Sequence, residues 1–133
     1  MNEQATIKKI FQLKTIAVVG LSPKTGRASN RVAAYLKSVG YTIIPVNPGF
    51  NEILGETCYP GLKDIPNAVD VVDVFRRPEH VEPIAEDAIA INAKALWLQD
   101  GVINETAARK AEDAGLMVVM NDCMFRRHLA MGF

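Results

Sequence analysis

Short apolar runs rich in β-branched residues alternate along this chain with segments whose apolar residues recur at helical spacing. Such alternation is typical of a parallel sheet with helices on both faces, because parallel strands need long crossover connections. Five runs are interpreted as strands: Thr15 to Val19, Thr42 to Val46, Val71 to Phe75, Ala95 to Leu98 and Met117 to Met120. The pattern therefore predicts an α/β fold with about five parallel strands.

The first helix is expected between the first two strands. Val32 and Leu36 lie four residues apart on its apolar face, and Gly40 follows as a C-terminal stop. Ser29 or Asn30 is expected to cap its N-terminus, since both side chains can accept a hydrogen bond from a free backbone N–H.

Two further helices are expected. One lies between the third and fourth strands and begins near Glu79 or His80, and the other is capped by Asn104 and ends at Gly115. Glycines and prolines break up the stretch from Asn51 to Asn67, where only a short helical turn is expected.

The sequence has no internal repeat and no linker, so residues 1–133 are expected to form a single domain. Right-handed crossovers favour a doubly wound sheet, for which we predict the strand order 3-2-1-4-5. In such a sheet a ligand binds beyond the carboxyl ends of the strands, where the winding reverses. The loops that follow the strands are therefore the candidate site.

Fifteen basic residues balance fifteen acidic ones, so no overall charge attracts the protein to nucleic acid or to an anionic membrane. The first residues have neither the apolar run of a signal peptide nor the composition of a transit peptide, and a cytoplasmic protein is expected. Cys58 and Cys123 lie too far apart in sequence to indicate a zinc site. We expect free thiols that are packed and inert rather than reactive.

The loop after the first strand combines glycines, hydroxyls and basic residues and leads into a helix N-terminus, which is the chemistry of a phosphate cradle. It has neither the GxGxxG pattern of dinucleotide-binding proteins nor the GKS or GKT of a Walker loop. The alternative is an exposed loop in which glycine serves only the turn. The candidate ligand-binding residues here are Gly20, Ser22, Lys24, Arg27, Ser29 and Asn30.

Two adjacent arginines, Arg76 and Arg77, follow the third strand. A guanidinium group matches phosphate geometry, so at least one of them is expected to bind an anionic ligand. The alternative is that they pair with Asp73 or Glu79.

No catalytic constellation is evident. Neither His80 nor His128 has a Ser, Cys or carboxylate neighbour that would indicate a triad or a metal site, and both are expected to be structural or exposed. Asp100, after the fourth strand, is the best-placed carboxylate, although beside Gly101 it can be a turn residue only.

Taken in order, several segments resemble the small single-domain CoA-binding proteins, which are similar to the N-terminal CoA-binding domain of the succinyl-CoA synthetase α-subunit. The matching segments are "IAVVGLSP", "SNRVAAYLKSVGYTIIPVNP", "EILGETCYPGLKDIP", "VDVVDVFRRPEHV" and "AKALWLQDGVINETAARKAEDAGLMVVMNDC". The resemblance implies a Rossmann-like fold with coenzyme A as the ligand.

The resemblance also implies residue roles. The CoA diphosphate would lie at Gly20, Ser22, Ser29 and Asn30, the adenosine beside Val46, Asn47 and Pro48, and the pantetheine arm along Phe75, Arg76, Arg77 and Pro78. A lysine that follows the second strand in the synthetase is replaced here by Gly49 and Phe50, so Lys24, Arg27 and the two arginines are the candidate phosphate-binding charges.

Ligase activity is not implied, because the synthetase carries its phosphorylated histidine in a second domain and needs a second subunit. The first hypothesis is therefore a module that binds CoA or an acyl-CoA without catalysis of its own, as a carrier, sensor or partner subunit. The alternatives are an NAD(P)-binding domain of the oxidoreductase type and a protein-interaction subunit whose pocket is vestigial.

The second strand ends in "PVNP" and has no acidic residue, whereas many nucleotide-binding folds place a carboxylate there to bind the free ribose hydroxyls. CoA carries a 3′-phosphate on that ribose, and a carboxylate would repel it. Asn47 offers a hydrogen-bond donor without negative charge, although Asn-Pro can also be a turn and no more.

Replacing Asn47 with Asp is accordingly expected to weaken CoA binding, because it adds a negative charge beside the 3′-phosphate. Calorimetric titration with CoA and with dephospho-CoA measures the effect. Equal losses of affinity for CoA and for dephospho-CoA would contradict the proposed repulsion.

Overall fold

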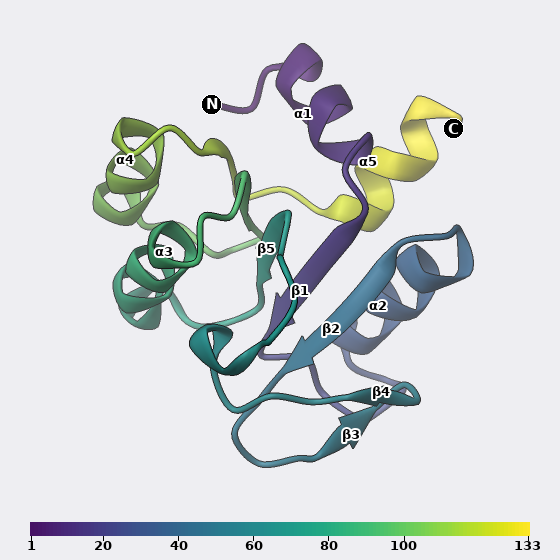
Figure 1. The fold of residues 1–133 in the computed structure, drawn as a ribbon. Coiled ribbons are helices and arrows are strands. Elements are labelled where there is room, and N and C mark those ends of the chain that lie inside the picture. The colour runs from purple at the N-terminus through teal and green to yellow at the C-terminus, as the bar shows by residue number, and fades with distance from the viewer.

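Five parallel strands form the central sheet of the computed structural model, which describes residues 1–133 (Figure 1). The strands are β1 (Thr15–Val19), β2 (Thr42–Val46), β5 (Val71–Val74), β6 (Ala95–Leu98) and β7 (Met117–Met120). The helices are α1 (Gln4–Phe11), α2 (Ala28–Ser38), α3 (Val81–Ala90), α4 (Glu105–Asp113) and α5 (Met124–Met131). The predicted Rossmann-like α/β fold is confirmed.

The strand order differs from the prediction. The sheet runs β2-β1-β5-β6-β7, which in chain order of these five strands is 2-1-3-4-5 rather than 3-2-1-4-5. Strand β5 therefore pairs directly with β1, Ile16 being opposite Val71. The winding reverses between β1 and β5, and the ligand crevice of such a sheet lies at that switch point.

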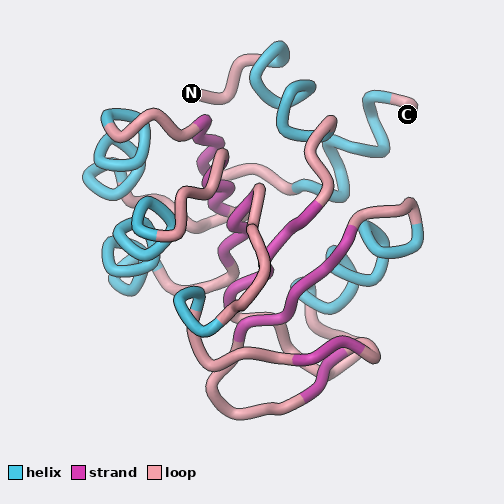
Figure 2. Tube along the Cα trace, in the orientation of Figure 1, coloured by secondary structure: helices cyan, strands magenta, loops and turns pink.

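The chain between β2 and β5 explains this order. It contains a small antiparallel ribbon of β3 (Glu52–Ile53) and β4 (Glu56–Thr57), and then a 3₁₀ turn, η1 (Leu62–Asp64), within the stretch expected to be irregular (Figure 2). After β4, Tyr59 forms a parallel bridge to Val46 and so occupies the outer edge of β2. The third strand cannot pair there and instead enters the sheet beside β1.

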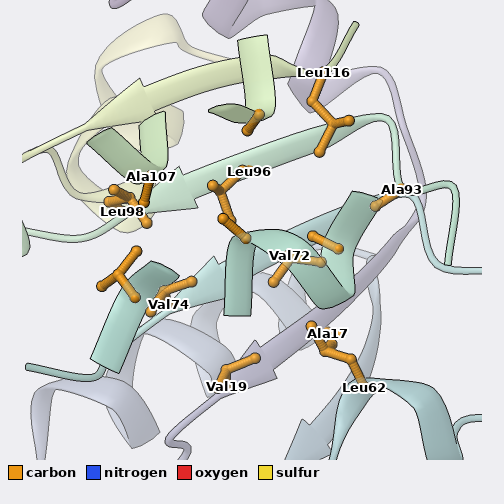
Figure 3. Packing of buried hydrophobic residues seen from close by; sticks show 14 of the residues in the cluster. Ala17, Val19, Leu62, Val72, Val74, Ala93, Leu96, Leu98, Ala107 and Leu116 are labelled. Atoms are coloured by element: carbon orange, nitrogen blue, oxygen red, sulfur yellow. The ribbon is translucent and has the colours of Figure 1, made fainter. Parts of the chain in front are cut away.

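Each face of the sheet carries its own hydrophobic core, and the helices are divided between them. Helices α3 and α4 cover one face, and α1, α2 and α5 cover the other (Figure 1). Figure 3 shows the first core, in which Val72, Leu96 and Leu98 of the sheet lie together with Ala107 of α4. Trp97 is fully buried in the second core.

The helices begin and end close to the expected positions, with one correction. Asn104 caps α4, where its side chain accepts a hydrogen bond from the backbone N–H of Ala107. Helix α2, however, already begins at Ala28, so that Ser29 and Asn30 lie inside it and are not its caps. Helices α1 and α5 were not predicted from the sequence.

Asp73 is an unusual residue for the middle of a sheet. It is fully buried in β5, and neither of its carboxylate oxygens has a hydrogen-bond partner. Burial away from water raises the pKa of this carboxyl well above its usual value. The folded protein therefore favours the protonated acid.

A raised pKa makes the stability of the fold depend on pH. The folded state holds the Asp73 proton more tightly than the unfolded state, so stability is highest below the unfolded-state pKa and falls as pH rises through the folded-state pKa. Replacing Asp73 with Asn removes this loss, and the melting temperature of the variant relative to wild type should increase steadily from acidic to alkaline pH. The exposed Asp113, replaced with Asn, is the control. Melting temperatures of wild type and Asp73→Asn that change in parallel with pH would contradict the prediction.

Candidate functional site

A cavity of about 740 Å³ opens at the carboxyl ends of β5, β6 and β7, between α2 and α5. Its volume is in the range of sites for small molecules and cofactors. The lining residues come from α2, from the segments after the three strands and from α5: Ala28, Arg31, Val32, Phe75, Arg76, Arg77, Pro78, Gln99, Asp100, Gly101, Val102, Cys123, Phe125, Arg126 and Leu129. The cavity thus lies at the end of the sheet where the site was predicted.

Four of these lining residues are arginines: Arg126 is ion-paired, Arg31 donates to the Gly26 carbonyl, and Arg31, Arg76 and Arg77 have no carboxylate within ion-pair distance. Arg76 and Arg77 are the adjacent arginines after β5 that the sequence singled out. The alternative that they pair with Asp73 or Glu79 is therefore wrong. Asp73 is sealed inside the sheet, while Glu79 lies exposed in the turn η2 (Pro78–His80). Unpaired guanidinium groups at a cavity rim favour an anionic ligand.

The one carboxylate in the cavity wall is neutralised. Arg126 forms a bidentate pair with Asp100, both distances being 2.9 Å, and also contacts Asp122 at 3.0 Å. The hydrogen bonds from Arg126 lower the pKa of Asp100, which keeps it ionised and paired. Arg127 contacts Asp122 as well, at 2.7 Å. These pairs attach α5 to the ends of β6 and β7.

Two other polar groups line the cavity between β6 and α5. Gln99 is 3% exposed, and its Oε1 accepts a hydrogen bond of 3.3 Å from the backbone N–H of Met124. Its amide Nε2 has no partner in the protein. Cys123 precedes α5 and is a free thiol, as expected; it is half-buried, packs against the second core and also lines the cavity.

The first predicted loop is shaped by its own polar side chains. The hydroxyl of Ser29 accepts a hydrogen bond from the backbone N–H of Ser22 at 3.0 Å, and Asn30 donates to the Ser22 carbonyl at 2.9 Å. The Ser22 hydroxyl accepts from the backbone N–H of Lys24. Lys24 and Arg27 are exposed and form no ion pair. Both cations are therefore free to meet a ligand.

The second predicted loop is tied to the first. Asn47 donates a hydrogen bond from Nδ2 to the Leu21 carbonyl at 3.1 Å and accepts one from the Gly49 N–H at 3.0 Å. Val46 is buried in β2, whereas Pro48 is exposed. The amide of Asn47 thus holds the two loops together, as the turn interpretation of Asn-Pro implies, so binding tests on this residue need a stability measurement beside them.

At Gly20 these two loops meet the third loop, which follows β5. Its φ of +84° is in the left-handed region, and a Cβ atom there would lie 2.5 Å from the Phe75 carbonyl oxygen and 3.0 Å from Cδ of Arg76. Only glycine avoids both the strain and the clash. Its small size allows the Arg76 side chain to cross the end of β1.

Comparison with known proteins gives the family of the chain. A family model described as "CoA binding domain" matches residues 14–128. The chain belongs to this family of CoA-binding domains. The resemblance inferred from the motifs is thereby confirmed.

The relatives of this CoA-binding domain are of two kinds. An uncharacterised Bacillus subtilis protein is 40% identical over 126 residues, covering 94% of this chain and 93% of its own length. The ADP-forming acetate–CoA ligase I of Archaeoglobus fulgidus is 31% identical over 128 residues, which cover 89% of this chain but only 19% of the ligase. The chain is thus homologous to one part of a much longer enzyme.

Solved structures of small proteins share the whole fold of the domain. A hypothetical protein from Pyrococcus horikoshii superposes with a TM-score of 0.92 at 41% identity and covers 98% of this chain and 92% of its own. A protein from Thermus thermophilus gives a TM-score of 0.91 at 33% identity, with 98% and 99% coverage.

Of the thirteen residues predicted for the site, Phe75, Arg76, Arg77 and Pro78 line the cavity. The other nine lie in or beside the first two loops and belong to the same end of the sheet. The lining residues from α5 were missed because that helix was not predicted. Its signal was present in the spacing of Met124 and His128, four residues apart and both buried.

None of the helices is both long and apolar enough to cross a membrane. No group of three His, Cys, Asp or Glu side chains is placed to hold a metal ion. Of the two histidines, His80 is exposed and His128 is buried with its Nδ1 2.7 Å from the Tyr35 hydroxyl, so both are structural or exposed as predicted.

Replacing Gly20 with Ala should destabilise the domain by about 3 kcal/mol, since it adds backbone strain and a clash with Phe75. Gly40→Ala is the matched control, because Gly40 has a similar φ of +106° but open space around its Cβ position. Urea unfolding of both variants measures the difference. Equal losses of stability would show that the contact with Phe75 has no energetic consequence.

Proposed function

We propose that this domain binds coenzyme A or an acyl-CoA at the carboxyl ends of its strands and acts, without catalysis of its own, as a carrier, sensor or partner subunit. The observation that carries the proposal is that two adjacent arginines, Arg76 and Arg77, line a cavity with an apolar wall and form no ion pair. CoA is a highly anionic nucleotide attached to a long, less polar arm. Membership of the CoA-binding domain family supports the same ligand.

The arrangement of the loops supports an orientation for the ligand. The adenosine lies beside Pro48, and the diphosphate lies at the turn from Gly20 into α2, where free backbone N–H groups and the helix dipole favour negative charge. The pantetheine arm then passes Phe75 and enters the cavity. There the unpartnered amide of Gln99 can donate to one of its carbonyl groups.

The absence of a catalytic role is supported by the chemistry of the cavity wall. Asp100 is engaged with Arg126, and His128 lies in an aromatic cluster beside Tyr35, with Phe11 5.1 Å away between ring centres. Neither group is free to exchange a proton with a bound ligand. In the acetate–CoA ligase of Archaeoglobus fulgidus, the region that matches this domain is only 19% of the chain.

A second candidate ligand is NADP, because Arg76 or Arg77 could also bind a 2′-phosphate. Titration calorimetry with CoA, acetyl-CoA, NAD and NADP separates the two. Heat with CoA species and none with NADP is expected, and bound CoA should raise the melting temperature. Binding of NADP alone would replace this proposal with the oxidoreductase-type alternative. Failure of all four ligands to bind would favour a protein-interaction role.

The Arg76→Gln variant should bind CoA about 10 to 100 times more weakly than wild type, since it removes a charged hydrogen-bond donor to phosphate. The loss should shrink as salt concentration rises. Arg109→Gln is the matched control, because Arg109 is an exposed arginine of α4 that forms no ion pair and does not line the cavity. An unchanged dissociation constant for Arg76→Gln would exclude this residue from the phosphate site.

A further inference from the structure

Cys123 occupies a position in the cavity that the proposed function does not use. It lies directly after β7 and before α5, it is half-buried, and its side chain is part of the cavity lining. Its sulfur makes no hydrogen bond, unlike that of the other cysteine. A thiol that is open to a ligand cavity can take part in chemistry.

Gln99 places a second unused polar group in this part of the cavity. Its side chain is almost completely buried, yet Nε2 has no partner in the protein, while Oε1 is held by Met124. Nε2 is not among the sealed, unpartnered atoms of the protein and Gln99 lines the cavity, so this amide is available to an acceptor on a ligand. Gln99 directly follows β6, the strand next to β7, so a ligand that contacts Gln99 shares the cavity with Cys123.

The dimensions of the sheet agree with the length of the pantetheine arm. From the end of β1, where the diphosphate is proposed to bind, three strand steps lead through β5 and β6 to β7. At about 4.8 Å for each step, this is roughly 14 Å. The arm has about twelve bonds between phosphate and sulfur, as many as four extended residues, which also span about 14 Å. An extended arm is therefore long enough to bring the CoA sulfur to the end of β7.

We propose that Cys123 forms a mixed disulfide with coenzyme A by exchange with CoA disulfide, an inference that rests on the proposed CoA site. The Cys123 thiolate attacks one sulfur of the CoA disulfide. The S–S bond between the two CoA molecules breaks, a new S–S bond joins one CoA to Cys123, and the other CoA leaves as a thiolate that takes up the proton lost by Cys123. The domain then carries CoA covalently until a thiol releases it.

The second cysteine provides a control within the same chain. Cys58 is 7% exposed and does not line the cavity, and its Sγ donates a hydrogen bond to the Asn47 carbonyl at 3.4 Å. Burial raises the pKa of this thiol. Cys58 should therefore stay unreactive under conditions in which Cys123 reacts.

The test incubates the fully reduced protein with CoA disulfide and, separately, with glutathione disulfide, at pH 8, and follows each reaction by intact-mass spectrometry. Wild type and Cys58→Ser should gain one CoA, located at Cys123 by peptide mapping and removed by dithiothreitol. Cys123→Ser should gain none. Because the nucleotide site concentrates the reagent beside the thiol, the CoA adduct should form at least roughly tenfold faster than the glutathione adduct.

Calorimetry with reduced CoA on the same samples distinguishes the possible failures. Equal rates with both disulfides would show Cys123 to be only an accessible thiol and would overturn the inference. Measurable CoA affinity without an adduct at Cys123 would overturn the inference but leave the proposed function standing. Absence of both CoA affinity and adduct would overturn both.

Discussion

The ends of three strands converge on the backbone of Gly20, and the arrangement of the site depends on this contact. The Gly20 N–H donates to the Val46 carbonyl at the end of β2, and the Phe75 N–H donates to the Val19 carbonyl at the end of β1. Because Gly20 has no side chain, the segment after β5 can pass directly over it. The first, second and third loops therefore meet at the switch point of the sheet, where a long anionic ligand can touch all three.

Charge around the cavity is divided between pairs that hold the structure and cations that remain free. Arg126 and Arg127 are engaged with Asp100 and Asp122, and this network fastens α5 beside the cavity. Arg76 and Arg77 have no such partners. A protein with no net charge thus presents positive charge locally, at the mouth of one cavity, which suits a specific anion better than general attraction to polyanions.

Local patterns in the sequence predicted the elements well where a helix or strand carries its own signal. The five strands, the Asn104 cap and the turn at Leu62–Asp64 could be inferred because apolar periodicity and capping chemistry are properties of neighbouring residues. The strand order could not, because it depends on Tyr59 closing the edge of β2, a contact between residues distant in sequence. Ser29 and Asn30 were misassigned as caps for the same reason, since their partner Ser22 lies across a loop.

The sequence by itself determined the fold class and the family, which follow from periodicity and from ordered motifs, and it predicted the end of the sheet at which the cavity lies. Only the tertiary structure decided which arginines are free, that Asp73 is buried without a partner, and that Cys123 and Gln99 share the cavity. The physical reason is that pairing and burial depend on three-dimensional neighbours. The residue type sets which interactions a side chain can make, and its neighbours in the fold decide which of these interactions are formed within the protein.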